Sequence, residues 1–276
     1  MPHREVPDIE VHTLTDTGQV RADNQDAIRT CPPGDPHAEA QGHLYGIADG
    51  MGGFAHGGVA SAMALEILFK TFYGAPTAHP LQRLKQGVQE ANLGIYQAAS
   101  RLGVGRMGTT LTAVHLQGHV LNVAHVGDSR GYLIRGGRAT CFTSDHTRVG
   151  ELVRMRLLSP DKVRTHAQRS VLDRCLGLDL FVQPDLFTLP IGPGDRVVLC
   201  TDGVWGAIED QDFADVAARE PTLEGYNRFL LEEALRRGSD DNLSLLTLQC
   251  NALAGSPQSH PPGSALGAFF ARVFRR

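Results

Sequence analysis

The chain has few cysteines and lacks any long hydrophobic run. Its five cysteines among 276 residues never form a Cys-x-x-Cys pair, so neither a disulfide framework nor a zinc site is expected. No stretch of about 18 apolar residues occurs, which argues against a membrane-spanning helix. The N-terminus also lacks a basic region followed by an apolar segment, so no secretory signal is expected. These absences predict a cytoplasmic protein with reduced cysteines.

An excess of positive charge is also missing. The 26 basic and 30 acidic residues give a net charge of −4, so the chain offers no overall basic field for nucleic acid, which we do not expect as a partner. Hydrophobic residues make up 42% of the sequence, enough for a large core. We expect one catalytic domain over 1–252, followed by a tail, in a protein that acts as a monomer.

Two kinds of periodicity predict an α+β fold. Apolar runs bounded by turns predict strands at 43–49, 109–117, 119–126, 131–135, 138–142, 196–201 and 243–249. Helical spacing of apolar residues predicts helices at 59–72, 81–100, 210–218 and 222–237. This order favours a four-layer sandwich, in which two antiparallel β-sheets pack face to face and helix pairs cover them.

Two segments stand apart from this pattern. Residues 143–172 combine a short helical pattern with a polar run, which predicts an insertion, or flap, beside the functional face, with an ordinary connecting loop as the alternative. Residues 253–276 pair a linker rich in Pro, Ser and Gly with an amphipathic, basic end. This tail could contact a membrane surface or a partner, or it could pack on the domain or stay unstructured.

Six short motifs, most of them acidic, are the main functional signal. They are Arg-Ala-Asp-Asn-Gln-Asp at 21–26, Asp-Gly-Met-Gly-Gly at 49–53, Gly-Thr-Thr-Leu at 108–111, Gly-Asp-Ser-Arg at 127–130, Thr-Asp-Gly at 201–203 and Asp-Asp-Asn at 240–242. A strand that ends in Asp-Gly presents a carboxylate from a rigid edge, and glycine permits close approach of the backbone. Oxygen ligands without Cys or His suit magnesium or manganese rather than zinc.

In this order the motifs resemble those of the metal-dependent protein serine/threonine phosphatases of the PPM type, the phosphatase 2C family, in their compact bacterial form. The resemblance covers about residues 8–250 and implies hydrolysis of phosphoserine and phosphothreonine by a hydroxide that bridges two metal ions, without a covalent intermediate. A serine/threonine kinase and its phosphorylated substrates are the implied partners. The alternatives are a pseudophosphatase that only binds phosphoproteins and a phosphatase for a small regulatory protein or a small phosphoester.

The resemblance also assigns ligands for two Mn²⁺ or Mg²⁺ ions. Asp49 would bridge both ions, and Asp202 and Asp241 would complete the set around the first ion. The Gly50 carbonyl would join Asp49 on the second ion, while Asp26 would hold water molecules nearby.

Three further residues have assignments with open alternatives. Arg21 is expected to bind the phosphate through its guanidinium fork, or else to be a surface arginine. Asp128 matches the ligand of a third, weaker ion, or else bonds backbone amides in a turn. Ser129 is not expected to be a nucleophile, because its surroundings lack the Gly-x-Ser-x-Gly elbow.

Several positions depart from the family pattern. Gln25 stands where a glutamate is usual, which removes one acidic charge near the second ion. Met51 replaces the histidine proposed as general acid in animal relatives, so water is expected to protonate the leaving group. Phe54 and Gly58 occupy positions of frequent His and Glu, and His56 is expected to be a solvated residue at a helix entry.

Overall fold

The protein is described here from a computed structural model that covers residues 8–32, 34–51, 56–75 and 78–252. Phe54 and the tail at 253–276 lie outside the described residues, so what the sequence predicts for them stays a prediction. Among the residues described, no helix is sufficiently long and apolar to cross a membrane.

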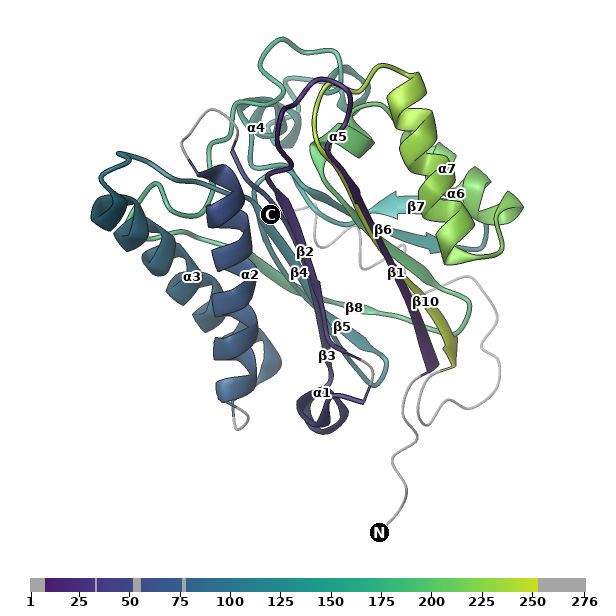
Figure 1. The fold of residues 1–276 in the computed structure, drawn as a ribbon. Helices are drawn as coiled ribbons and strands as arrows, with labels where there is room; N and C mark the ends of the chain where they lie inside the picture. Colours follow the sequence, from purple (N-terminus) through teal and green to yellow (C-terminus); the bar gives the residue numbers. More distant parts are fainter. Residues whose placement is uncertain (1–7, 33, 52–55, 76–77, 253–276) are drawn as a thin grey trace.

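Within the described residues, ten strands form two antiparallel sheets (Figure 1). One sheet has the order β1 (Asp8–Asp16), β10 (Leu243–Ala252), β9 (Arg196–Cys200), β6 (Arg130–Arg135) and β7 (Arg138–Cys141). The other has the order β2 (Asp26–Thr30), β3 (His43–Asp49), β4 (Leu111–Gln117), β5 (Val120–Val126) and β8 (Asp185–Pro190).

Helices cover the outer faces of both sheets. The sheet that contains β3 is covered by α2 (Gly57–Gly74) and α3 (Pro80–Leu102), and the sheet that contains β10 by α6 (Asp210–Arg219) and α7 (Leu223–Arg236) (Figure 1). The short elements are α1 (Pro36–Gln41), α4 (Arg148–Arg154), the 3₁₀ turn η1 (Pro160–Lys162) and α5 (Asp202–Trp205). The predicted four-layer α+β sandwich is confirmed.

Three apolar clusters correspond to the three interfaces of this sandwich. Between the sheets, residues such as Ile47, Val114, Leu199 and Leu246 pack together. A second cluster joins α2 and α3 to their sheet, and a third joins α6 and α7 to theirs. Because each sheet is buried on both faces, its central strands are apolar almost throughout.

All seven predicted strands and all four predicted long helices are present, but three strands were not predicted. These are β1, β2 and β8, which all lie at sheet edges. Their side chains are half-buried or exposed for most of their length, so they lack the apolar runs that identified the central strands. The fourth edge strand, β7, is the predicted strand at 138–142, and Gly136 and Gly137, both with positive φ, form the tight turn that precedes it.

The packing between the sheets predicts a large stability effect at Leu199. Leu199→Ala should lower the free energy of unfolding by about 2–5 kcal/mol, because the fully buried side chain would leave a cavity between two rigid sheets. Urea denaturation followed by circular dichroism measures this. In the control, Val120→Ala, the lost side chain is 41% exposed, and a loss as large as that of Leu199→Ala would contradict the two-sheet core.

Candidate metal and phosphate site

The strand ends at one side of the sandwich bring together motifs that lie far apart in the sequence. The loop between β1 and β2 arches over this end beside α5 (Figure 1). Below it lies a cavity of about 190 Å³. The residues that line it are Arg21, Ala22, Asp23, Gln25, Asp49, Gly50, Asp241 and Asn242. Four residues that the sequence assigned to the site therefore line one cavity.

Asp26 and Asp49 lie directly opposite one another in the antiparallel pair of β2 and β3. One carboxylate oxygen of Asp26 accepts a hydrogen bond from the Thr201 hydroxyl at 2.9 Å. The other, Oδ1, is buried and has no hydrogen-bond partner among the described residues. Like charges in directly opposed positions destabilise a sheet, so this pair is favourable only with a compensating positive charge.

The pKa values of the acidic residues show the same repulsion between neighbouring carboxylates. Burial raises the pKa of Asp26 to about 6 and that of Asp202 to about 7, and the charge of Asp241 adds to both shifts. Burial and then neighbouring carboxylates hold the pKa values of Asp49 and Asp128 well above the ordinary value of 3.8. The protein thus gathers carboxylates where, in the absence of a cation, each one resists ionisation.

Two glycines allow the backbone to approach closely at the site. A Cβ atom on Gly50 would lie 2.3 Å from the Gly57 carbonyl oxygen, and one on Gly203 would lie 2.1 Å from the Asn242 carbonyl oxygen. Any larger residue at position 203 would therefore push away the Asn242 backbone, which directly follows Asp241. This explains why glycine follows the aspartate at both strand ends.

Polar side chains around Asp49 fix its position. The Asp49 backbone N–H donates to the Thr110 hydroxyl at 2.9 Å, and the Thr109 hydroxyl donates to the Asp49 carbonyl at 2.8 Å. Both threonines therefore bond the Asp49 backbone and support its position. Asn242 supports the neighbouring loop, because it accepts from the Gln25 backbone N–H at 2.9 Å and donates to the Asp23 carbonyl at 3.0 Å.

Arg21 lies at the rim of the cavity, where its side chain is 44% exposed. Its guanidinium donates to Oδ2 of Asp241 at 2.6 Å, while Oδ1 of Asp241 accepts from the Asn242 backbone N–H at 2.9 Å. Both carboxylate oxygens of Asp241 therefore have protein partners. The guanidinium is close enough to the cavity to contact a ligand that enters it.

Asp128 is placed differently from the other acidic residues. It is 4% exposed and does not line the cavity, and its carbonyl accepts a hydrogen bond from the Trp205 indole at 2.9 Å. Its neighbour Ser129 is fully buried and bonds the Thr110 hydroxyl at 2.8 Å. The nearby His125 bonds the Thr112 hydroxyl instead, so Ser129 and His125 do not form a pair. That Ser129 is not a nucleophile stays a prediction.

A second cavity of about 200 Å³ adjoins the first across Arg21 and Asp241. It is lined in addition by Arg169 and Ser170 of the flap and by Arg237 at the end of α7. The polar run in the flap was the sequence signal for Arg169. Nothing in the sequence indicated Arg237, because only the tertiary fold brings the end of α7 to this place.

The donor atoms fit a hard divalent cation. They are oxygens, and two of them, Oδ1 of Asp26 and Oδ1 of Asp202, are buried without a hydrogen-bond partner among the described residues. In the part of the chain that the structure describes, no group of three or more His, Cys, Asp or Glu side chains is arranged to hold an ion by itself. Asp241 faces Arg21, so it would have to part from Arg21 to act as a ligand.

The departures from the family pattern also have defined positions. The Oε1 atom of Gln25 is buried without a hydrogen-bond partner among the described residues, and it lies beside Gly57 at the start of α2. Met51 follows Gly50 and donates its backbone N–H to the Gly108 carbonyl at 3.0 Å. His56 is exposed at the N-cap of α2 and makes no side-chain capping bond, as expected for a solvated residue at a helix entry.

Comparison with known proteins identifies the family. Residues 19–244 match the family model described as protein phosphatase 2C. The serine/threonine protein phosphatase PstP of Mycobacterium tuberculosis is 36% identical over 234 residues, which are 84% of this chain but only 43% of that protein. The serine/threonine phosphatase stp of Listeria monocytogenes serovar 1/2a is 31% identical over 85% of this chain and 93% of the relative.

Solved structures agree. The PPM Ser-Thr phosphatase MsPP from Mycobacterium smegmatis, in complex with cacodylate, has a TM-score of 0.75 and 35% identity, with coverage of 88% of this chain and 98% of its own. The catalytic domain of PstP in complex with two manganese ions has a TM-score of 0.74 and 32% identity, with coverage of 87% and 97%. The chain therefore belongs to the protein phosphatase 2C family.

Proposed function

We propose that this protein is a metal-dependent phosphatase that hydrolyses phosphoserine and phosphothreonine in proteins. The observation that carries the proposal is the direct opposition of Asp26 and Asp49, near the charge of Asp202, with Arg21 at the rim of the cavity that Asp49 lines. Buried oxygens without partners favour a divalent cation, and a half-exposed guanidinium suits a phosphate dianion.

Asp49, Asp202, Asp241 and the Gly50 carbonyl are the proposed ligands of two Mn²⁺ or Mg²⁺ ions. When bound, these ions supply positive charge that activates water for attack and neutralises the phosphoryl oxygens. The solved structure of the PstP catalytic domain in complex with two manganese ions supports this number. A third, weaker ion at Asp128 is part of the proposal, since Asp128 is buried near the charge of Asp202.

The protein's own groups position the reactants. Arg21 binds two phosphate oxygens through its fork, which requires it to release Asp241 and thereby frees that carboxylate for an ion. Asp26, held by the Thr201 hydroxyl, orients water beside Asp49. Met51 has no proton to donate, so we assign protonation of the leaving alkoxide to water, and no residue forms a covalent bond to phosphorus.

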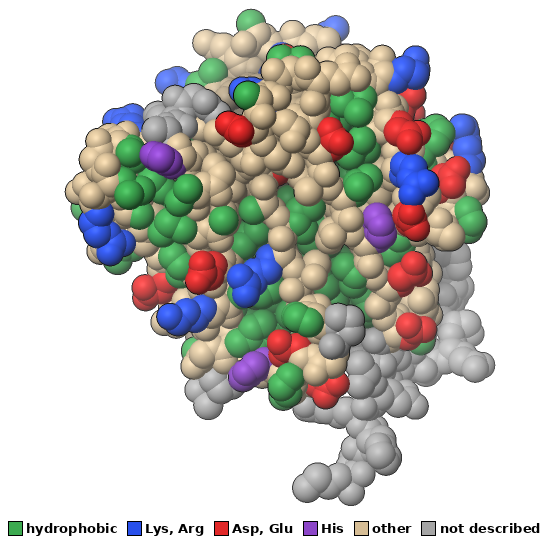
Figure 2. All heavy atoms as spheres, in the orientation of Figure 1, with side chains coloured by type: hydrophobic (Ala, Val, Ile, Leu, Met, Phe, Trp, Pro, Cys, Tyr) green, Lys and Arg blue, Asp and Glu red, His purple; other side chains and the backbone are tan. Residues whose placement is uncertain are grey.

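The proposed partners are phosphorylated proteins, among them a serine/threonine kinase and its substrates, whose action the enzyme would reverse. The mixed distribution of acidic and basic side chains on the face in Figure 2 fits a protein substrate better than nucleic acid. The flap at 143–172 lies beside the second cavity through Arg169 and Ser170, where it would contact residues that flank the phosphoserine. We propose that the protein acts as a monomer in the cytoplasm.

Turnover of a phosphothreonine peptide with and without Mn²⁺ tests the function, with Asp49→Asn as the diagnostic variant. The change is nearly isosteric but deletes a charge shared by two cations, so turnover at saturating Mn²⁺ should fall by more than about tenfold, equivalent to 1.4 kcal/mol. Asp215→Asn, at an exposed position on α6, is the control and should keep normal turnover.

Two outcomes would contradict this proposal. If Asp49→Asn kept turnover within tenfold of the unmodified protein, Asp49 would not bridge the ions. If the unmodified protein bound the phosphopeptide without any Mn²⁺-dependent turnover, the alternative of a pseudophosphatase would replace the enzyme.

The role of Arg21 predicts a loss of phosphate affinity in Arg21→Lys. The lysine keeps the charge but loses the second parallel hydrogen bond to phosphate, so kcat/KM should fall about tenfold or more. The inhibition constant of inorganic phosphate should rise by a similar factor. Arg228→Lys, an exposed change on α7, is the matched control, and an unchanged phosphate inhibition constant would show that Arg21 does not bind phosphate.

The missing charge at Gln25 predicts that Gln25→Glu lowers the Mn²⁺ concentration for half-maximal activity. A carboxylate binds a hard cation, or its ordered waters, more strongly than an amide oxygen does. Calorimetric titration with Mn²⁺ should show the same trend, and Gln117→Glu at the exposed end of β4 serves as control. An equal or weaker metal response in Gln25→Glu would place this side chain beyond reach of the ions.

A further inference from the structure

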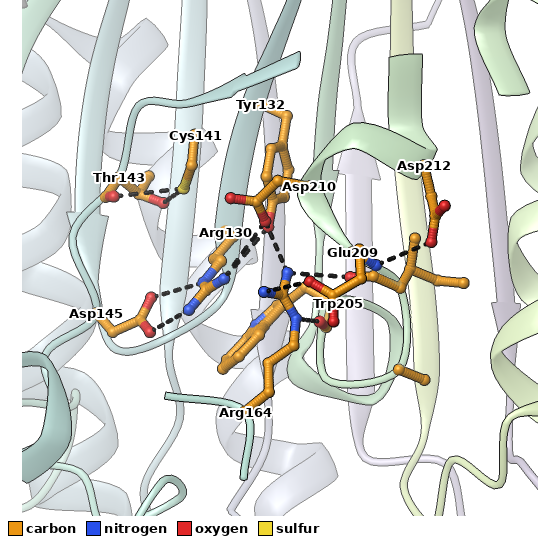
Figure 3. A network of polar contacts seen from close by, with 12 residues as sticks. Arg130, Tyr132, Cys141, Thr143, Asp145, Arg164, Trp205, Glu209, Asp210 and Asp212 are labelled. Carbon is orange, nitrogen blue, oxygen red and sulfur yellow. Dashed lines mark hydrogen bonds and ion pairs between the residues drawn. The ribbon is translucent and has the colours of Figure 1, made fainter. Parts of the chain in front are cut away.

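Arg164 connects the flap to the segment that follows α5. Its Nε donates to the Trp205 carbonyl at 2.9 Å, and its Nη2 donates to the Ile208 carbonyl at 3.0 Å and to Oδ1 of Asp210 at 2.7 Å. Its Nη1 lies 3.1 Å from a carboxylate oxygen of Glu209. Figure 3 shows this guanidinium pointing into the group formed by Trp205, Glu209 and Asp210. The side chain is only 13% exposed.

Trp205, which Arg164 holds through its carbonyl, is connected to two aspartates of the proposed metal site, to one by a side-chain hydrogen bond and to the other through the backbone of α5. Its indole N–H donates to the Asp128 carbonyl at 2.9 Å. It also ends the single turn of α5 that begins at Asp202, where the Gly206 N–H donates to the Asp202 carbonyl at 2.8 Å. A displacement of Trp205 would therefore move the backbone at both aspartates.

A second arginine fixes the indole ring. The guanidinium of Arg130 lies 3.6 Å from the centre of the Trp205 ring and makes two bonds to Asp145, at 2.9 and 2.7 Å (Figure 3). Arg130 and Asp145 are both buried. Arg130 thus holds the ring while Arg164 holds the backbone of the same residue, which leaves Trp205 one position.

We propose that Arg164 is a positioning residue through which the flap sets the affinity of the site for divalent cations. It acts through Trp205 on Asp128 and Asp202 and touches neither the ions nor the substrate. The inference rests on the proposed function only in taking these two aspartates as metal ligands. It deepens that function by giving the flap a structural connection to the metal site.

The geometry explains why an arginine is needed. Its acceptors, two carbonyls and one carboxylate, are reached from two different nitrogens of one planar group. A lysine has a single nitrogen at the end of a flexible stem and cannot reproduce this fork. Arg154, another flap residue, pairs with Glu151 of its own helix α4, so it provides a matched control.

Calorimetric titration of the full chain with Mn²⁺, in the absence of substrate, tests this directly. Arg164→Met should weaken Mn²⁺ binding by about five- to tenfold, because groups outside the ligand shell orient the ligands. Arg164→Lys should show a smaller loss, and Arg154→Met should bind Mn²⁺ like the unmodified protein. Thermal unfolding of the metal-free proteins separates a loss of fold stability from a loss of metal affinity.

Trp205 offers a second measurement that does not depend on activity. It is the only tryptophan among the 276 residues, so the intrinsic fluorescence reports on this one ring. The emission maximum of metal-free Arg164→Met should shift to longer wavelength as the ring loses its fixed, buried position, while Arg154→Met should not shift.

Unchanged Mn²⁺ affinity in Arg164→Met and Arg164→Lys, within twofold, would overturn the inference even if both variants melted earlier. If Arg164→Met does not fold, the Mn²⁺ affinity of Arg164→Lys is the test, and a change of less than twofold overturns the inference. Failure of the proposed function has a different signature, namely an unmodified protein that binds Mn²⁺ but does not hydrolyse the phosphopeptide.

Discussion

The mutual repulsion of buried carboxylates is the constraint on which the functional end of this protein depends. Asp26 and Asp49 face one another across β2 and β3, and Asp202 contributes a further buried oxygen without a partner among the described residues. Such an arrangement costs free energy in the isolated chain and is favourable only when cations share it. The stability of the core therefore has to support the site, which explains the rigid strands and close glycine contacts around it.

The two-sheet sandwich supplies that support because the site is drawn from both sheets. Asp26 and Asp49 belong to the sheet of β3, whereas Asp202 and Asp241 flank β9 and β10 of the other sheet. The apolar cluster between the sheets fixes the distance between the two sheets, and polar side chains at their junction adjust the positions of the aspartates. The Thr201 hydroxyl bonds Asp26 across the junction. The packing between the two sheets therefore also sets how the acidic residues of the site lie relative to one another.

The flap is attached to the domain more firmly than a connecting loop would be. Val149 and Val163 are buried in the cluster beneath α6 and α7, and Arg164 bonds the turn after α5. By contrast, Arg169 and Ser170 lie at the second cavity. The first part of the flap therefore belongs to the supporting structure, and its last residues face the site. This division fits the positioning role and the contact with the substrate that we propose for the flap.

The sequence by itself determined the layered α+β fold, because central strands buried on both faces are apolar runs. It also determined which acidic residues stand at the strand ends, because Asp-Gly after an apolar run is a visible motif. It missed β1, β2 and β8, whose half-exposed edge positions leave no such run. Only the tertiary structure decided that Arg21 pairs with Asp241, that Arg237 lines the second cavity and that Arg164 bonds Trp205. Each of these features depends on an arginine that meets groups distant in the sequence, and no local pattern specifies the partner of an arginine.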